Sequence, residues 1–303
     1  MNKHDEYREQ VALLLRIMPH IYDIEQFAVH GGTAINLFVK NMPRYSVDID
    51  LTYLPLADRT TSLNDINRLL AKLRQTLLQR IPGMRIIHKP DVWKLLCTLN
   101  TAMVKIEVNG TKRGVLEEVE IHPLCPAAEE DFKTSCDARI VSFSQLYGGK
   151  LSAALSRQHP RDLFDFKHMN CPFDAVRDGL LLALAGSDKP IVESLLPNPI
   201  DQHDALEKQF FGMSEETFSY DEYEQVRKEL QQYILDGLTN EDRNFLISFE
   251  QGEPDWTLCH AGDLSRFPSV QWKLLNLTKL KKQNPTKLYA EVEKLKQVLL
   301  SFV

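Results

Sequence analysis

The residues most able to do chemistry lie in the stretch HGGTAINLFVKNMPRYSVDID, residues 30–50. A short apolar run enters a Gly-Gly-Thr turn at residues 31–33, and a helical segment is predicted over residues 34–39. Asp48 and Asp50 follow in an extended segment, where residues i and i+2 point to the same face. Two such carboxylates can share a divalent cation, and a glycine turn that opens a helix offers N–H groups to a phosphate. The combination favours metal-assisted nucleotide chemistry.

Neither half of this pattern is specific alone, because most Gly-Gly turns are only turns and most D-x-D pairs are solvated strand ends. The order strand, G-G-T, helix, R-x-S-x-D-x-D is far more restrictive. It resembles the nucleotidyltransferase fold of the DNA polymerase β superfamily. More closely, it resembles the AbiEii/AbiGii toxin family of abortive-infection and type IV toxin–antitoxin systems, which implies a role in phage defence. Many relatives carry G-S where this chain has Gly32-Thr33, and we expect the threonine hydroxyl to keep the phosphate contact.

A third carboxylate is expected from the extended segment 102–108. Lys105 and Glu107 share one face of it, opposite Ile106 and Val108. Half-buried strands alternate in this way for structural reasons alone. The family resemblance, however, implies a carboxylate on a strand beside the D-x-D strand, and Glu107 matches it. Glu107 would complete the metal site or accept the proton of the attacking hydroxyl.

Two further motifs follow in the order that the family shows. The first is K-x-x-A-x-x-x-R, from Lys150 to Arg157. On one helix these two residues lie about 20° apart around the axis, and cations on one face can neutralise a triphosphate. An exposed basic helix face is the alternative. The resemblance implies that Lys150 binds nucleotide phosphate.

The second motif, P-R-D-L-F-D, covers residues 160–165. Asp162 and Asp165 are expected in the first turns of a helix, where the helix dipole favours carboxylates. Arg161 and Asp165 are spaced i, i+4 and could simply pair with each other. The resemblance implies that the aspartates orient Lys150 or the metal site, with Asp165 as the first choice and Asp162 as the second.

Composition is that of an ordinary globular protein: 303 residues, 43% hydrophobic and 26% charged. No apolar run approaches the roughly 18 residues that span a bilayer, and the charged N-terminus is unlike a signal peptide. The five cysteines are odd in number and form no C-x-x-C pair. A disulfide framework or structural zinc site is therefore not expected. We expect a cytoplasmic location without membrane contact.

Charge is unevenly distributed along the chain, whose formal net charge is −6. Residues 201–255 hold fifteen Asp/Glu against four Lys/Arg, which is −11. Residues 264–303 hold eight Lys/Arg against two Glu, which is +6. Solvated helix surfaces would explain both runs, and a basic surface facing RNA is the sharper interpretation of the second.

The fold class predicted from these patterns is α/β (α+β). A polymerase β-like nucleotidyltransferase core with a small mixed sheet is expected over residues 1–140. A mostly helical domain, which carries the K-x-x-A-x-x-x-R and R-D-L-F-D motifs, is expected over residues 141–303. Strands are predicted over 84–88, 94–99, 102–108 and 116–122, and helices over 5–19 and 63–80.

The resemblance therefore implies a nucleotidyltransferase toxin that uses Mg²⁺, or Mn²⁺ in its place, to move a nucleoside monophosphate from an NTP to an acceptor. A tRNA 3′ end is the expected acceptor, and a cognate antitoxin protein is an expected partner. Modification of a protein hydroxyl, phosphotransfer and non-catalytic nucleotide binding remain the alternatives. The implied catalytic, nucleotide-binding and metal-binding residues are, taken together, Gly31, Gly32, Thr33, Asp48, Asp50, Glu107, Lys150, Arg157, Arg161, Asp162 and Asp165.

Overall fold

The computed structural model describes residues 2–300, and the chain folds as two compact units. The first unit runs to Ser142 and also takes in Glu207–Thr217; the second begins at Phe143 and holds the remainder. The domain limits expected from the sequence, 1–140 and 141–303, stay a prediction, and residues 301–303 lie outside the described residues.

A seven-stranded mixed sheet forms the centre of the first unit, with the order β3-β4-β5-β2-β1-β7-β6. β1 pairs antiparallel with β2, and β2 pairs parallel with β5. Parallel pairing also joins β1 to β7. The carboxylate strand β2 therefore lies between two neighbours near the middle of the sheet. The strands are β1 (Phe27–His30), β2 (Asp48–Tyr53), β3 (Arg85–Lys89), β4 (Lys94–Leu99), β5 (Ala102–Val108), β6 (Glu120–Pro123) and β7 (Asp137–Ile140).

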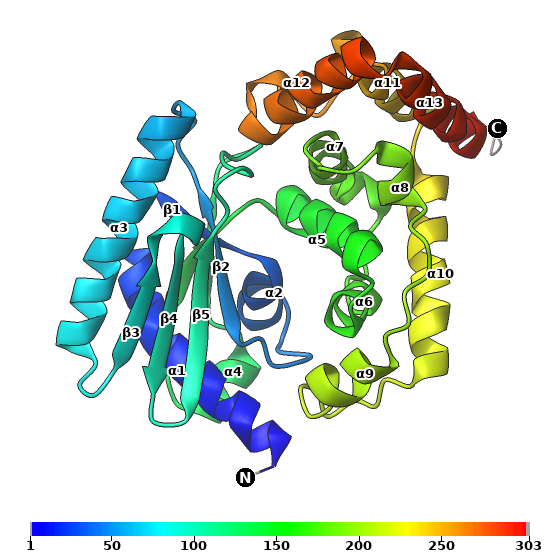
Figure 1. Cartoon of the computed structure of the whole chain (residues 1–303). Coiled ribbons are helices and arrows are strands. Elements are labelled where there is room, and N and C mark those ends of the chain that lie inside the picture. The colour runs from blue at the N-terminus through cyan, green and yellow to red at the C-terminus, as the bar shows by residue number, and fades with distance from the viewer. Residues whose placement is uncertain (1, 301–303) are drawn as a thin grey trace. The chain divides into compact units, whose positions relative to one another are not determined.

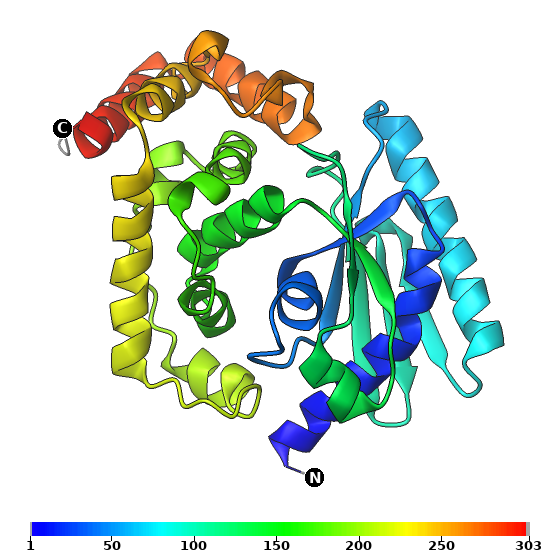
Figure 2. The same cartoon turned by 180° about the vertical axis from the view of Figure 1, so that it is seen from behind.

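Helices cover both faces of this sheet (Figures 1 and 2). On one face lie α1 (Lys3–Tyr22) and α3 (Arg59–Arg80), whose apolar stripes are buried. The stripe of α3 is the predicted one: Ile66, Leu69, Leu70, Leu73 and Leu77. On the other face lies α2 (Gly31–Ala34), which continues as the π-helical segment η1 (Ile35–Val39). A short helix, α4 (Pro126–Phe132), precedes β7.

The second unit is helical, and its centre is α5 (Phe143–Arg157). Gly148 of α5 lies against Gly179 of α7, where an added Cβ atom would overlap the Gly179 carbonyl carbon. Only glycine allows this approach, so α5 is fixed directly against α7. The other helices are α6 (Pro160–Lys167), α7 (Arg177–Ala185), α8 (Ile191–Leu195), α9 (His203–Ala205), α10 (Tyr220–Gly237), α11 (Asn240–Glu250), α12 (Pro268–Gln283) and α13 (Pro285–Leu300), with short 3₁₀ or π segments η3 (Phe173–Ala175), η4 (Leu206–Phe210), η5 (Trp256–Leu258) and η6 (Leu264–Arg266).

The predicted α/β class, mixed sheet and helical C-terminal half are confirmed. One predicted strand is too long: residues 116–119 are not in a strand, and β6 covers Glu120–Pro123 only. Its partner β7 has four residues, all of them paired with β6, so the ladder ends there. The glycine pair is also not a separate turn before the helix, because α2 begins at Gly31 itself.

None of the helices within residues 2–300 is both long and apolar enough to cross a membrane.

Candidate active site

The carboxylates of the first unit come together through strand register. Asp50 on β2 lies opposite Glu107 on β5, and Asp48 lies opposite Lys105. Along both strands these charged residues alternate with buried apolar ones, such as Ile49 on β2 and Ile106 opposite it on β5. The apolar side chains point into the core, so the four charged groups share the opposite face. The sequence-predicted grouping of Asp48, Asp50 and Glu107 on one face is therefore observed.

Two lysines balance this group of carboxylates. Lys105 Nζ lies 3.1 Å from Glu107 Oε2 and 3.9 Å from Asp48 Oδ2, while Lys94 Nζ lies 2.9 Å from Glu107 Oε1. Burial alone would raise the pKa of Glu107, but its two lysine partners outweigh burial and lower that pKa. Burial likewise opposes the charged form of Lys105, and the neighbouring carboxylates still raise its pKa. Glu107 and Lys105 are therefore both charged at neutral pH. The side chains of Asp48, Lys105 and Glu107 are each about one-third exposed.

The glycine pair allows side chains of opposite charge to approach the start of α2. Gly31 has a positive φ of 70°, and a Cβ atom there would lie 2.8 Å from Asp50 Oδ2. A Cβ atom on Gly32 would lie 2.9 Å from Arg44 Nη2 and 3.0 Å from Ser46 Oγ. Any larger residue would push these groups away. The glycines thus bring a carboxylate to one residue and a guanidinium to the next.

The Thr33 hydroxyl has a structural partner. It donates to the backbone carbonyl of Asp48 at 2.5 Å and lies 3.1 Å from Ser46 Oγ, and its side chain is 1% exposed. This bond ties the first turn of α2 to the first residue of β2. The phosphate contact expected of this hydroxyl stays a prediction, and the observed bond shows that Thr33 also positions Asp48.

The donor set suits a hard divalent cation. Carboxylate oxygens are the ligands that Mg²⁺ prefers, and Mg²⁺ is commonly held by one or two carboxylates together with substrate phosphates. Asp48 and Asp50 match that pattern. Within residues 2–300 no group of three or more His, Cys, Asp or Glu side chains is arranged to hold a metal by itself. Both carboxylate oxygens of Glu107 contact lysines, one Lys94 and the other Lys105.

In the second unit, Lys150 lies between two buried aspartates. Its Nζ atom is 3.0 Å from Asp162 Oδ1 and 2.6 Å from Asp165 Oδ2. Lys150 is 5% exposed and the Asp165 side chain is fully buried. Arg157, also on α5, contacts Asp162 at 2.9 Å but is 63% exposed. The prediction that Lys150 and Arg157 share one helix face is confirmed, and both aspartates, rather than one, contact Lys150.

Burial and the ion pairs act in opposite directions on Asp162 of this cluster. Burial alone would raise the pKa of Asp162, but Lys150 and then Arg157 outweigh it and lower that pKa. The neighbouring Tyr147 hydroxyl has its pKa raised by burial and by the charge of Asp165. It is buried and has no hydrogen-bond partner among residues 2–300. With one lysine, one arginine and two aspartates, the cluster is close to neutral overall.

Arg161 is only half-buried at the start of α6, where its backbone N–H is capped by His159 Nδ1. Arg44 and Ser46 are site residues that were not singled out from the sequence. The R-x-S-x-D-x-D spacing did indicate them, because residues 44, 46, 48 and 50 point to the same side of an extended chain.

These features agree with a sequence comparison. The family model described as "Nucleotidyl transferase AbiEii toxin, Type IV TA system" matches residues 12–276, which is most of the chain. The chain belongs to the AbiEii nucleotidyltransferase toxin family. It is thus a nucleotidyltransferase that uses an NTP, and a toxin of a type IV toxin–antitoxin system, which implies a cognate antitoxin. The family resemblance found in the motifs is confirmed.

A solved structure supports the fold. The chain is similar to MenT4, a nucleotidyltransferase toxin from Mycobacterium tuberculosis H37Rv, with a TM-score of 0.61 at 14% identity. The match covers 90% of this chain and 93% of MenT4, so the similarity in fold extends over nearly the whole length of both proteins. A search of curated proteins found no match.

Proposed function

We propose that this AbiEii-family protein transfers a nucleoside monophosphate from an NTP to an acceptor hydroxyl in a Mg²⁺-dependent reaction. The acceptor oxygen forms a bond to the α-phosphorus while the bond from that phosphorus to the α,β-bridging oxygen breaks. The electron pair of the broken bond leaves with pyrophosphate, and the hydroxyl proton passes to a base. The observation that carries this proposal is the charged face shared by Asp48, Asp50 and Glu107 beside the glycine pair.

The first unit supplies the reacting centre in this proposal. Asp48 and Asp50 would hold Mg²⁺, or Mn²⁺ in its place, and the bound ion would act as a Lewis acid on the α-phosphate. Gly31 and Gly32 would bind the phosphates through their backbone at the start of α2, and Thr33 fixes the backbone of Asp48. Glu107 completes the charged face and accepts the hydroxyl proton once its lysine contacts loosen, which is a role that its exposure permits.

The second unit supplies Lys150, for which the motif implies a phosphate contact. The proposal keeps Lys150 and Arg157 as nucleotide ligands, with Asp162 and Asp165 holding the lysine in place. Two charge-assisted contacts fix the ammonium geometry, as preorganised catalysis requires. Among the nucleotide-binding residues proposed in the second unit, the half-buried Arg161 has the least support.

The proposed acceptor is RNA, in particular a tRNA 3′ end. The support is the concentration of lysines in the helices α12 and α13, against the acidic stretch that precedes them. Lys279, Lys281 and Lys282 are all exposed, and so is Trp272 on the same helix. Basic side chains with an accessible aromatic ring are the groups that bind phosphates and stack on bases. A reaction that consumes NTPs also fits a cytoplasmic location.

Labelled nucleotides test this proposal directly. Purified protein is incubated with each NTP carrying the label on the α-phosphate, with Mg²⁺ and total RNA, and the RNA and protein fractions are separated. We expect label in the RNA only. Label in protein would support modification of a protein hydroxyl instead. Transfer from a γ-labelled but not an α-labelled NTP would establish a phosphotransferase, and no transfer at all would support a nucleotide-binding regulator.

A further inference from the structure

Arg44 is a buried arginine on the loop that joins η1 to β2. It is 4% exposed, and its Nη1 atom donates to the Tyr45 carbonyl at 2.8 Å. Its Nη2 atom lies 2.9 Å from the position that a Cβ atom on Gly32 would take. The guanidinium is therefore held directly against the backbone of the glycine pair. This places a buried positive charge beside the first turn of α2, where a helix start offers N–H groups to a phosphate.

The glycine pair has a negative group on one side and a positive group on the other. Asp50 approaches Gly31, whereas Arg44 and Ser46 approach Gly32. A nucleoside triphosphate has a matching asymmetry. Its α-phosphate must lie where the carboxylates can hold a cation, and its β- and γ-phosphates carry most of the negative charge and depart. These charges thus match a triphosphate whose α-phosphate lies on the Gly31 side and whose β- and γ-phosphates lie on the Gly32 side.

We propose that Arg44 binds the β- and γ-phosphates of the NTP and stabilises the departing pyrophosphate, with Ser46 as a neighbouring hydrogen-bond donor. The proposal rests on the proposed function and adds a subsite to it. A planar guanidinium with five donors binds phosphate oxygens in pairs. Lys94 and Lys105 contact Glu107, whereas the Arg44 guanidinium lies against the glycine pair itself.

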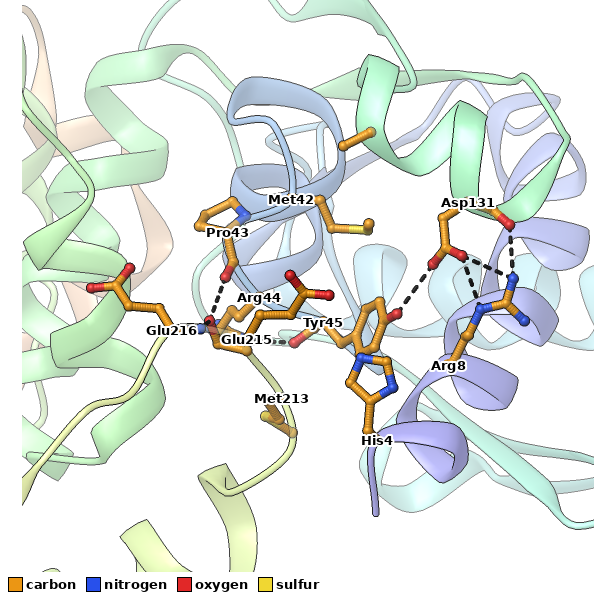
Figure 3. Close-up of a pocket in the computed structure, with 12 residues that line it drawn as sticks. His4, Arg8, Met42, Pro43, Arg44, Tyr45, Asp131, Met213, Glu215 and Glu216 are labelled. Carbon is orange, nitrogen blue, oxygen red and sulfur yellow. Dashed lines mark hydrogen bonds and ion pairs between the residues drawn. The ribbon is translucent and has the colours of Figure 1, made fainter. Parts of the chain in front are cut away.

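Arg44 also lines a pocket of the first unit. The pocket measures about 510 Å³ and lies within the first unit. Figure 3 shows Arg44 with Glu215 and Glu216 at one end of it, and the ion pair between Arg8 and Asp131 at the other. The same pocket thus contains a second arginine, Arg8, with which Arg44 can be compared.

Binding of inorganic tripolyphosphate tests this subsite without turnover. Calorimetry compares the wild type, Arg44→Ala, Arg44→Lys and Arg8→Ala, each titrated with tripolyphosphate and with a nucleoside monophosphate. Arg8 is the matched control, because it is an arginine that lines the same pocket but pairs with Asp131. We expect Arg44→Ala to weaken tripolyphosphate binding by roughly tenfold or more, as the loss of a charge-assisted contact implies, with binding of the monophosphate unchanged.

Arg44→Lys keeps the charge but loses the paired donors, so tripolyphosphate binding should weaken by about threefold or more. If Arg44→Ala does not fold, the change in tripolyphosphate binding of Arg44→Lys tests the subsite by itself. Pyrophosphate inhibition of turnover should weaken in the same order, and Arg8→Ala should resemble the wild type. The subsite is wrong if tripolyphosphate binding is unchanged in the folded Arg44 variants, or if both ligands weaken equally. If the wild type transfers no α-label but tripolyphosphate binding still depends on Arg44, the subsite stands and the proposed function fails.

Discussion

Asp48, Lys105 and Glu107 are each about one-third exposed, whereas Lys150 and Asp162 are 5–6% exposed and Asp165 is fully buried. Both clusters combine lysines with carboxylates within ion-pair distance. In the first, the lysine contact to Asp48 is loose, at 3.9 Å. In the second, the contacts from Lys150 are 3.0 and 2.6 Å. The same residue types thus form an open cluster in one unit and a closed cluster in the other.

This difference determines what each cluster can do. Exposed ion pairs contribute little to stability, so their members can exchange a protein partner for a metal ion, a phosphate or water at low cost. Removing one member of a buried pair leaves a charge without compensation, which is strongly destabilising. Substitutions in the open cluster should therefore affect activity with little loss of stability, and those in the closed cluster should affect both.

The largest effect is expected at the open cluster. Asp48→Ala and Asp50→Ala should each reduce nucleotidyl transfer by roughly a thousandfold or more, because the charge that holds the metal is worth several kcal/mol in the transition state. The melting temperature should change little, since Asp48 is partly exposed. Initial rates with α-labelled NTP and thermal unfolding are measured side by side. Turnover at the wild-type rate in either variant, with Mg²⁺ present, would remove this site from the mechanism.

The closed cluster should respond first in stability. Lys150→Ala leaves Asp162 and Asp165 buried without their lysine, so we expect a loss of about 3–5 kcal/mol in the free energy of unfolding. Arg157→Ala is the matched control, because Arg157 contacts the same Asp162 from an exposed position. It should cost about 1 kcal/mol or less. Urea unfolding measures both variants.

The same pair also tests the role of Lys150 in nucleotide use. At a temperature where both variants are folded, Lys150→Ala should reduce kcat/KM for NTP more than Arg157→Ala, by about 2–4 kcal/mol of transition-state stabilisation. If Lys150→Ala is destabilised but turns over NTP like the wild type, the closed cluster is a structural brace only.

A smaller effect is expected in the pH dependence of stability. The folded-state pKa of Asp162 lies below its ordinary value, which is near 3.9 in an unfolded chain. Its ion pairs therefore stabilise the fold fully above about pH 4, and this contribution is lost as the pH falls through the lower, folded-state pKa. Urea unfolding of the wild type and Asp162→Asn between pH 6 and pH 3 measures it. The stability difference between them should shrink toward pH 3; a constant difference would mean that Asp162 does not titrate in this range.

Much of the open cluster could be predicted from the sequence because its signals are local. The alternation of Asp48, Ile49 and Asp50 indicates a strand with a charged face, and the same holds around Glu107. That the two strands are neighbours was implied only by family resemblance, and the register that places Asp50 opposite Glu107 was not predicted. Parallel pairing across more than fifty residues leaves no trace in a single sequence.

Other features depend on tertiary neighbours. The enclosure of Lys150 was not predicted, because a basic residue on an amphipathic helix is usually solvated. Its burial follows from the packing of α6 beside α5, which brings both aspartates to the ammonium group. The helix α4 and the strand β7 were missed as well, since each has seven residues or fewer and little periodicity to detect. Arg44 was visible in its motif, but its contact with Gly32 depends on how the loop folds back.

The weakest expected effect concerns the acceptor, and it sharpens the comparison by asking whether the second unit also binds RNA. The hypothesis is that RNA binds along α12, where Lys279, Lys281 and Lys282 are exposed. Lys281 pairs with Glu253 at 2.6 Å, so its charge is already partly compensated. Replacing all three lysines by glutamine should weaken RNA binding at every sequence tested. The slope of log K against log salt should fall by about two to three units.

NTP binding should stay as in the wild type, because these lysines lie outside the nucleotide motifs. Glu253→Gln is the matched test of the pairing, since it releases Lys281 without removing any lysine. Made alone, Glu253→Gln should strengthen RNA binding slightly. Added to the triple lysine variant, it should leave RNA binding unchanged. Filter binding with a tRNA at several salt concentrations separates these cases. If the triple variant binds and modifies RNA normally at every salt concentration, α12 is a solvated helix and the acceptor does not bind through it.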